Sequence, residues 1–384
     1  MPGNLFRLKR SFKNHRIIKT IGSIATMRYP VYKPEITKNE KIYVNECLDS
    51  TWISSRGKFI EKFESAVASF VDVENAIAVC NGTVALHLAI EAYGIGAGDE
   101  VIIPDFTYIA TANAVKYTGA QVVLADVNLN SWNITVENID RCLTPKTKAV
   151  IVTDIYGTPP EMDEIREYCS IKNLILIEDA AESLGAVYKT QKAGNLADVA
   201  TLSFFGNKTI TTGEGGMVLT NNNEIAQKIR KLMNQGNSEK VRYYHDILGY
   251  NYRMTNIQAA IGYAQMQRIG SIINRKRKIF EIYKNELDGL VQFQEIQEHT
   301  KSSYWMVSFL LRDKFSRNKL MTKLEENGIE TRPFFYPVNK MPFYENCGNL
   351  DTEKLSDTGI NVPSYPTLKE EDIKWICSII KNNL

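Results

Sequence analysis

The sequence predicts an α/β fold, in which a large domain with a mostly parallel sheet is followed by a smaller C-terminal α+β domain. Between residues 76 and 220, short apolar runs alternate with segments of helical periodicity, which is typical of strands buried on both faces of a parallel sheet. Beyond about residue 289 this alternation stops. A chain of 384 residues is also longer than one ordinary core supports, which favours two domains.

Each expected strand is a short run rich in Val, Ile and Leu, and each expected helix repeats its apolar residues with a period near 3.6. Strands are expected at 76–80, 101–103, 122–125, 149–152, 174–177, 199–205 and 217–219. Helices are expected at 84–93, 110–117 and 161–170. A long helix at 255–288 then leads to a strand at 303–311 and helices at 317–327 and 369–382. We therefore expect a large domain over 29–265, followed by the linking helix and small domain over 266–384.

Composition limits the classes of function. The whole chain carries a net charge of +2, but residues 1–28 contain seven Lys and Arg and no acid, so the remaining body carries −5. A mildly acidic body argues against nucleic acid as the main partner. No apolar stretch approaches the roughly 20 residues of a membrane helix, so no membrane association is expected.

The basic residues 1–28 have the composition of an organelle transit peptide. Against that, a second methionine, Met27, directly precedes the expected start of the folded body. We therefore expect a disordered N-terminal extension. The six cysteines show no C-x-x-C spacing and the four histidines are isolated, which predicts reduced thiols, a cytoplasmic location and no metal site.

Two charged residues stand just beyond predicted strands. The run 174–177 ends in Glu178-Asp179, and Lys208 follows the run 199–205 just ahead of a glycine cluster. A lysine and an aspartate at strand ends are the pair that a pyridoxal phosphate site needs, although either residue alone is more often solvated surface. The amine holds the cofactor as a Schiff base, and the carboxylate keeps the pyridine nitrogen protonated.

Other residues at strand ends suit the cofactor phosphate and ring. Asn81-Gly82-Thr83 joins a strand to a helix, where free N–H groups and the positive end of the helix dipole bind phosphate. Ser203 supplies a further hydroxyl near its strand end, and Tyr108 follows a strand end where an aromatic ring can stack on the pyridine. The alternatives are an ordinary capped turn for the first motif and core packing for Tyr108.

Five motifs together carry a family resemblance. They are N-G-T (81–83), G-D-E-V-I-I-P-x-F-T-Y (98–108), I-E-D-A-A-E (177–182), S-F-F-G-N-K-x-I-T-T-G-E-G-G (203–216) and Y-N-Y-R-M-T-N-I-Q-A-A-I-G (250–262). With them, residues 29–384 resemble the DegT/DnrJ-type sugar aminotransferases. This resemblance implies the aspartate-aminotransferase fold (fold type I of pyridoxal phosphate enzymes) and a homodimer with shared active sites.

The resemblance also assigns roles to individual residues. It implies that Lys208 and Asp179 are catalytic, as the Schiff-base lysine and the partner of the pyridine nitrogen. The remaining cofactor contacts that it implies are Gly82, Thr83 and Ser203 on the phosphate, Tyr108 on the ring, Glu182 near the ring hydroxyl, and Asn251 on the phosphate of the neighbouring subunit. Glu182 departs from the His or Gln that many members carry there, which leaves its role in proton handling open.

Within the family, segments 50–58, 242–246 and 332–337 are most similar to the enzymes that form GDP-perosamine. This implies that L-glutamate donates an amino group to C4 of a nucleotide-linked 4-keto-6-deoxyhexose, with GDP-4-keto-6-deoxymannose favoured. Residues expected to contact the substrate are Trp52, Ser55, Arg56, His245, Arg253, Arg332 and Tyr336.

Other functions stay open at this point. The first alternative is the same transfer to a UDP- or dTDP-linked 4-keto-6-deoxyglucose. A sugar dehydratase on this scaffold is less favoured, because in those enzymes histidine replaces the lysine that is present here as Lys208. A cofactor-binding regulator or a purely structural protein explains the paired lysine and aspartate least well.

Overall fold

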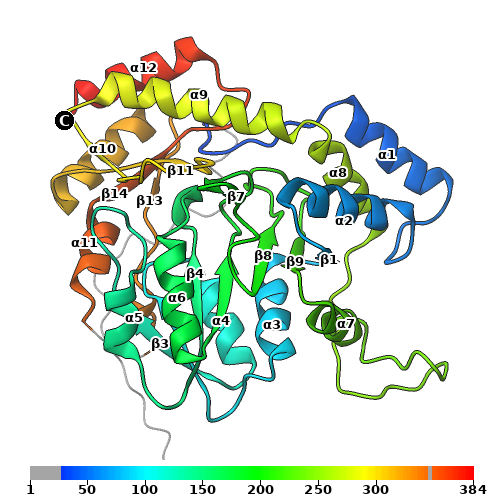
Figure 1. Cartoon of the computed structure of the whole chain (residues 1–384). Coiled ribbons are helices and arrows are strands. Elements are labelled where there is room, and N and C mark those ends of the chain that lie inside the picture. Colours follow the sequence, from blue (N-terminus) through cyan, green and yellow to red (C-terminus); the bar gives the residue numbers. More distant parts are fainter. Residues whose placement is uncertain (1–26, 345–347) are drawn as a thin grey trace, which may run out of the picture.

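The computed structural model describes residues 27–344 and 348–384, and in this part of the chain seven strands form the central sheet (Figure 1). Their order is β1-β9-β8-β5-β4-β2-β3. The strands are β1 (Asn75–Val79), β2 (Glu100–Pro104), β3 (Gln121–Ala125), β4 (Thr147–Thr153), β5 (Ile175–Asp179), β8 (Val199–Ser203) and β9 (Gly216–Thr220). β9 runs antiparallel to β1 and β8, and the other adjacent pairs are parallel. The predicted α/β fold with a mostly parallel sheet is therefore confirmed.

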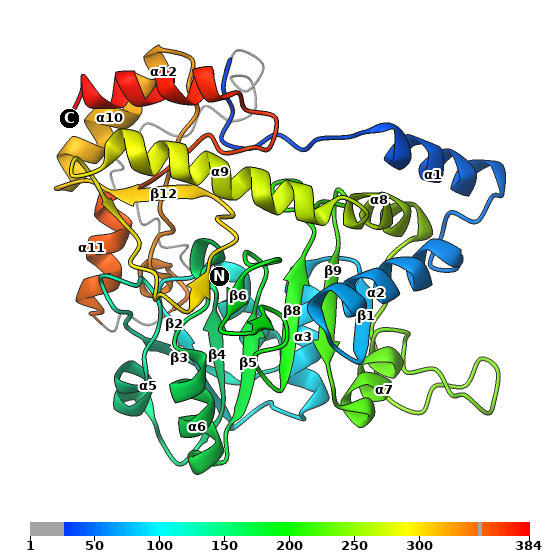
Figure 2. The same cartoon turned by 45° about the horizontal axis from the view of Figure 1, so that its top comes forward.

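Helices cover both faces of this sheet, because alternate residues of each buried strand point to opposite sides. Ile77 and Val79 pack with the helices α3 (Gly82–Ala92), α4 (Ile109–Tyr117) and α7 (Asn223–Leu232). Ala76 and Ala78 face the other side, with α2 (Lys58–Val71) and α8 (Asn256–Met266). On that side α5 (Val136–Cys142) and α6 (Met162–Lys172) cover the other end of the sheet, and α1 (Lys38–Asp49) lies against α8 (Figure 2).

The C-terminal part of the chain forms a second layered unit. A small sheet has the order β10-β12-β14-β13, made by β10 (Gln292–Phe293), β12 (Val307–Leu310), β14 (Gly359–Val362) and β13 (Arg332–Pro333). The helices are α9 (Ile269–Leu287), α10 (Lys314–Glu326), α11 (Leu350–Thr358) and α12 (Glu370–Lys381), and α9 packs against α12 across the top of Figure 1. Three short strands, β6 (Val187–Tyr188), β7 (Gln191–Lys192) and β11 (Thr300–Lys301), connect the two parts.

The start of the described chain belongs to the C-terminal core rather than to the central sheet. Tyr29 forms a parallel bridge with Ile329 and packs among the apolar side chains of α9, α10 and α12. The N–H of Val31 donates to Glu330 Oε2 at 2.9 Å. From there the chain passes to the central sheet, where the Tyr32 hydroxyl donates to the backbone oxygen of Lys208. Apart from Met27 and Arg28, the expected extension 1–28 lies outside the described residues.

The prediction of one long helix over 255–288 is wrong. The structure has two helices, α8 and α9, separated at Gln267 and Arg268. Arg268 leaves the helical region with φ −125° and ψ 16°. Its guanidinium bonds the carboxylates of Glu35 and Glu40, so a tertiary contact replaces the continuation of the helix.

Other helix and strand boundaries differ from the predicted ones by a few residues. β8 ends at Ser203 rather than at 205, and the strand expected at 303–311 covers only Val307–Leu310. In addition, α1, α2, α5, α7 and α11 had not been predicted. None of the helices in the described part of the chain combines the length and apolar character that a membrane crossing requires.

Candidate active site

The polar residues that follow the parallel strands meet at one edge of the central sheet. β1, β2, β4, β5 and β8 all run in the same direction, so their carboxyl ends share this edge. In open α/β sheets ligands bind at that edge. Asp179 ends β5 itself, whereas Lys208 stands five residues after the end of the neighbouring β8.

Lys208 is held in a tight loop with its amine directed inward. The backbone N–H of Lys208 donates to the backbone oxygen of Phe205 at 3.0 Å, and the Tyr32 hydroxyl donates to the backbone oxygen of Lys208. The side chain is 12% exposed, and Nζ lies 3.7 Å from Glu182 Oε1. Burial lowers the pKa of Lys208, while the carboxylates of Glu182 and Asp179 act in the opposite direction.

Asp179 is fixed by hydrogen bonds to both of its carboxylate oxygens. The Thr111 hydroxyl donates to Oδ2 at 2.7 Å, and the N–H of Ala181 donates to Oδ1 at 3.2 Å. A hydroxyl chain supports this arrangement, because Thr107 Oγ1 lies 3.0 Å from Thr111 Oγ1 and 3.1 Å from Thr153 Oγ1. Burial raises the pKa of Asp179, although the bond from Thr111 and the charge of Lys208 lower it. A cation bound to this carboxylate would offset the cost of burying it.

Glu182 is the second buried carboxyl group beside the lysine. It follows β5 by three residues, is 3% exposed, and accepts the N–H of Tyr156 at Oε2 over 2.8 Å. Burial raises the pKa of Glu182 to about 7, against the effect of Lys208. Glu182 is therefore able to exchange a proton near neutral pH.

An anion cradle lies where α3 begins. Asn81 caps the helix by accepting the N–H of Val84 at 3.0 Å, and the N–H groups of Gly82 and Thr83 have no intrahelical partner because they open the helix. A Cβ on Gly82 would lie 2.9 Å from Ser203 Cβ, so the turn and the end of β8 approach as closely as glycine allows. Gly216 leaves still less room, since a Cβ there would lie 2.3 Å from the oxygen of Asn81.

These groups fit pyridoxal phosphate. The cradle of Gly82, Thr83 and Ser203 suits a phosphate, because a helix N-terminus and a hydroxyl bind anions. Asp179 and Lys208 would supply the carboxylate and the amine that the ring and its aldehyde require.

Aromatic side chains form a wall beside the lysine that had not been predicted. Trp305 lies under Lys208, with Nζ 3.9 Å from the ring centroid. Its ring stacks on Tyr156 at 6.1 Å, and Tyr156 stacks on Phe335 at 5.4 Å. Tyr108, the predicted stacking residue, is 5.7 Å from Phe335 and is 57% exposed. Trp305 was assigned to a strand from its apolar neighbours, and no local signal relates it to Lys208.

The predicted substrate segment 50–58 is attached to the start of α8, a few residues after the predicted site residues Asn251 and Arg253. Asn256 at the start of α8 donates from Nδ2 to the oxygen of Trp52 at 2.6 Å, and from its N–H to the oxygen of Ser54 at 2.6 Å. The loop that carries Trp52, Ser55 and Arg56 is thereby attached to the segment that contains Asn251 and Arg253. Trp52 and Arg56 are exposed, and Ser55 is half-buried.

Asn251 and Arg253 extend the sheet edge at β1. Arg253 pairs with Val79, and the N–H of Cys80 donates to the oxygen of Tyr252 at 2.8 Å. Arg253 Nη2 donates to Asn251 Oδ1 at 3.0 Å, whereas its buried Nε has no hydrogen-bond partner among the described residues. Asn251 itself is exposed at this edge.

His245 lies on an arm, residues 235–249, that projects from the body after α7 (Figures 1 and 2). The base of the arm is closed by Gly236, whose φ is +66° and whose Cβ would lie 2.0 Å from the oxygen of Ile247. His245 Nδ1 is 2.8 Å from the oxygen of Gln235. Large apolar side chains of the arm are exposed, namely Val241, Tyr243, Tyr244, Ile247 and Leu248.

The last two predicted substrate residues come from the C-terminal part. Arg332 on β13 donates from Nε and Nη2 to Glu330 Oε1, each at 3.2 Å. Tyr336 is 61% exposed and follows Phe335, the outer ring of the aromatic wall. Within the described residues, no hydrogen bond or ion pair joins His245, Arg332 or Tyr336 to Lys208.

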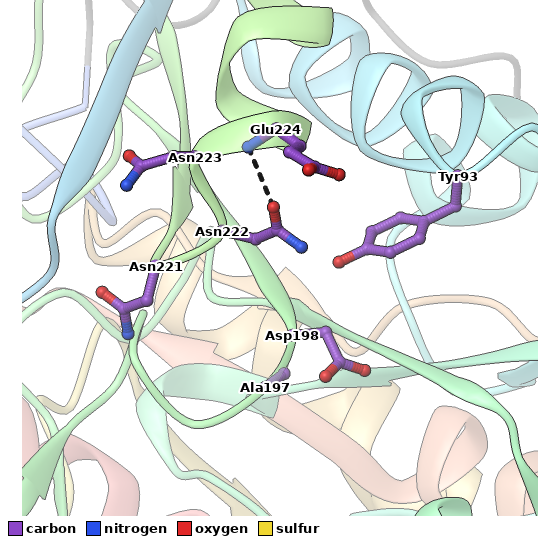
Figure 3. A pocket seen from close by; sticks show the side chains of 7 residues that line it. All are labelled: Tyr93, Ala197, Asp198, Asn221, Asn222, Asn223 and Glu224. Atoms are coloured by element: carbon purple, nitrogen blue, oxygen red, sulfur yellow. Dashed lines mark hydrogen bonds between the residues drawn. The ribbon is translucent and has the colours of Figure 1, made fainter.

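A shallow hollow of about 650 Å³ lies elsewhere on the molecule (Figure 3). It is lined by Tyr93, Ala197, Asp198 and residues 221–224. Asp198 precedes β8 and Asn221 follows the antiparallel β9, so the hollow is at the sheet edge opposite the candidate site. The side chain of Asn222 accepts the N–H of Glu224 there, which is an ordinary helix cap.

The fold, the buried Lys208 and Asp179 at one edge of the sheet and the free N–H groups at the start of α3 fit a pyridoxal phosphate-dependent enzyme. Residues 34–381 match the family described as DegT/DnrJ/EryC1/StrS aminotransferases, and the chain belongs to that family. The enzyme is therefore an aminotransferase that uses pyridoxal phosphate, and the resemblance seen in its motifs is confirmed.

Several curated relatives are similar over nearly their whole length. The chain is 48% identical to the GDP-perosamine synthase of Escherichia coli O157:H7 over 357 residues, which covers 92% of this chain and 98% of that protein. It is 48% identical to the GDP-perosamine synthase of Vibrio cholerae over 360 residues, with the same coverage. A third GDP-perosamine synthase, from Caulobacter vibrioides, is 44% identical and covers 92% of this chain and 97% of that protein.

Solved structures share the fold. The aminotransferase TlmJ from Streptoalloteichus hindustanus has a TM-score of 0.89 at 27% identity, and covers 93% of this chain and 98% of that chain. A putative sugar aminotransferase from Streptococcus pneumoniae has a TM-score of 0.88 at 24% identity, with coverage of 92% and 97%. The second likeness shows the fold alone, which agrees with the predicted aspartate-aminotransferase fold.

Proposed function

We propose that this enzyme transfers the amino group of L-glutamate to C4 of GDP-4-keto-6-deoxymannose and so forms GDP-perosamine for polysaccharide biosynthesis. The observation that carries the proposal is the position of Lys208 Nζ, buried beside Glu182 at the strand edge that also holds Asp179. Three GDP-perosamine synthases that are 44–48% identical to this chain support the choice of nucleotide and sugar.

Each residue has a task in this proposal. The bound cofactor supplies an electron sink for the carbon that loses a proton. Asp179 holds a proton on the ring nitrogen through a charge-assisted bond. Lys208 Nζ would accept and return the proton that moves during the transfer, and its burial favours the neutral amine that accepts a proton.

The remaining site residues would bind and orient the cofactor. Gly82, Thr83 and Ser203 would hold its phosphate, and Tyr108 and Glu182 would contact its ring, with the proton-handling role of Glu182 left open. The sugar nucleotide is bound by residues from three segments and the arm, namely Trp52, Ser55, Arg56, His245, Arg253, Arg332 and Tyr336.

The nucleotide is tested by comparing turnover on GDP-, UDP- and dTDP-linked 4-keto-6-deoxy sugars, with L-glutamate as the donor. We expect the GDP-linked sugar to have the highest kcat/KM, by at least about tenfold, because a site that hydrogen-bonds one base leaves polar groups unpaired with another. A preference for the dTDP- or UDP-linked sugar would favour the alternative substrate, 4-keto-6-deoxyglucose, while leaving the aminotransferase assignment intact.

The active unit in this proposal is a homodimer with shared sites. Asn251 lies exposed at the edge of the sheet, and the neighbouring Arg253 Nε is buried without a partner among the described residues. The exposed apolar residues of the arm support an interface on the same side of the molecule, since monomers seldom leave such side chains in water. Asn251 then reaches the cofactor phosphate of the partner subunit.

Shared sites predict that two inactive variants complement each other. Lys208→Ala protomers mixed with Asn251→Ala/Arg253→Ala protomers should regain up to about a quarter of the wild-type activity, because half of the dimers are mixed and each has one intact site. The measurement is activity after protomer exchange, with exchange followed by native mass spectrometry. Mixing two differently tagged Lys208→Ala preparations is the control. Exchange without activity would show that each subunit builds its own site.

We further propose a cytoplasmic location and the division into a large domain, 29–265, and a linking helix with a small domain, 266–384. The six cysteines, none of them in a C-x-x-C pair, support the reducing compartment. The separate core around α9, α10 and α12 supports the second domain, to which the segment at Tyr29 also contributes.

A further inference from the structure

Trp305 receives the amine of Lys208 on the face of its ring. Nζ lies 3.9 Å from the ring centroid, and the indole is 3% exposed. The same amine lies 3.7 Å from Glu182 Oε1. The lysine that is not joined to the cofactor thus has a defined position, over an aromatic face and near a carboxylate.

This position is built by contacts that keep the ring and the lysine loop together. Trp305 Nε1–H donates to the backbone oxygen of Asn207, the residue before Lys208, at 2.7 Å. The preceding Ser303 donates from its N–H to Gly157 at 3.0 Å and from its hydroxyl to the oxygen of Glu182 at 3.2 Å. A Cβ on Gly157, whose φ is +101°, would lie 2.9 Å from the N of Trp305. The ring, the lysine loop and Glu182 are therefore fixed relative to one another.

The chemistry of the contact favours the charged lysine. An aromatic face attracts an ammonium group but not a neutral amine, and the attraction is larger where water is excluded. Burial lowers the pKa of Lys208 and so favours the neutral amine, whereas the charged groups that face it, Glu182 and Asp179, raise that pKa. Trp305 therefore stabilises the ammonium form of Lys208 in addition to Glu182 and Asp179, and it does so without a further buried negative charge.

We propose that Trp305 is a positioning residue that holds the free amine of Lys208, as an ammonium beside Glu182, in the part of the reaction cycle when the lysine is not joined to the cofactor. The inference rests on the proposed role of Lys208. In this proposal Trp305, which belongs to the C-terminal part of the chain, determines the position of the Lys208 amine while that amine is not joined to the cofactor.

The test measures the free amine directly rather than turnover. The full chain is freed of cofactor with hydroxylamine, and Lys208 is labelled by a trace of acetic anhydride across a series of pH values and quantified by mass spectrometry. In Trp305→Leu the ratio of ammonium to amine at a given pH should fall by about 3- to 30-fold, which moves the labelling midpoint to lower pH. Trp305→Phe keeps an aromatic face and should remain within about threefold of wild type.

Controls separate the ring from general loosening of the core. Phe309→Leu, which changes a buried ring of the C-terminal core, should leave the Lys208 midpoint unchanged. If Trp305→Leu does not fold, Trp305→Met replaces it as the non-aromatic variant. A folded non-aromatic variant with the wild-type midpoint would overturn the proposal, as would a shift in Trp305→Phe as large as that in Trp305→Leu.

A second measurement distinguishes this inference from the proposed function. Wild-type enzyme is loaded with pyridoxal phosphate and reduced with borohydride, and the site of attachment is identified. Attachment at another lysine refutes the role of Lys208 and removes the basis of the inference. Attachment at Lys208 with an unchanged midpoint in the Trp305 variants refutes the inference alone.

Discussion

Replacing Lys208 with alanine is expected to abolish transamination, with a loss of at least about a thousandfold in turnover. The same amine attaches the cofactor and carries the proton, so its removal affects two steps. Lys208→Arg is expected to fail as completely, because a guanidinium stays protonated and forms no Schiff base under these conditions. The loop around the residue should survive either change, since its hydrogen bonds to Phe205 and Tyr32 use the backbone of Lys208.

The assignment is checked without relying on activity. Wild-type enzyme should be yellow, should lose its colour with glutamate or borohydride, and should show the reduced cofactor on Lys208 in a digested sample. A second buried lysine provides the control, because Lys276 is 1% exposed and lies on α9. Lys276→Met should retain both the colour and the adduct on Lys208. An adduct at Lys276, or at any other lysine, would contradict the assignment.

Asp179→Asn is expected to fold like the wild type and to lose about 100-fold or more of its turnover. The amide keeps the shape of the side chain, and the Thr111 hydroxyl can still donate to its oxygen as it now donates to Oδ2. The negative charge is lost, however, and with it the force that keeps the ring nitrogen protonated. The deficit should therefore lie in kcat, with little change in the melting temperature.

Thr111→Val is the matched control for this prediction. It removes the hydroxyl that binds Asp179 but leaves the carboxylate, so its loss of turnover should stay below about tenfold. Turnover, the melting temperature and the visible spectrum are measured for both variants. Near wild-type turnover in Asp179→Asn would show that another group binds the ring nitrogen.

The features that sequence patterns predicted are those that depend on neighbours along the chain. A buried parallel strand is a continuous apolar run, and the polar residue that follows it marks the edge of the sheet. Asp179 was located in this way, and Lys208 only approximately, since β8 ends five residues before it. The helix α2 was not predicted although it carries an equally local signal, because Phe59, Phe63, Val67 and Val71 recur every four residues and are all buried. The functional roles of the site residues stay predictions.

What the sequence could not predict depends on contacts between distant residues. The break at Arg268 arises from carboxylates at Glu35 and Glu40, more than 200 residues earlier, and nothing near Arg268 shows it. Trp305 lies against Lys208 through contacts between residues far apart in the chain, namely the bond from its Nε1–H to the oxygen of Asn207 and the bond from the N–H of Ser303 to Gly157. The arm that carries His245 has no apolar periodicity, and its large apolar side chains Val241, Tyr243, Tyr244, Ile247 and Leu248 are exposed in the protomer.

The first described residues pack in the C-terminal core, and this has a consequence for how the chain folds while it is being translated. On the ribosome the central sheet, which ends at Thr220, is complete while Ile329 and Glu330 are still to be made. Tyr29 and Val31 must wait for these partners, and pairings between such distant residues form slowly. Tyr32 joins this segment to the backbone of Lys208. In a nascent chain the central sheet therefore forms before this hydrogen bond fixes the loop around Lys208. Stable capture of the cofactor is therefore expected only after Ile329 and Glu330 have been made and have paired with the N-terminal segment.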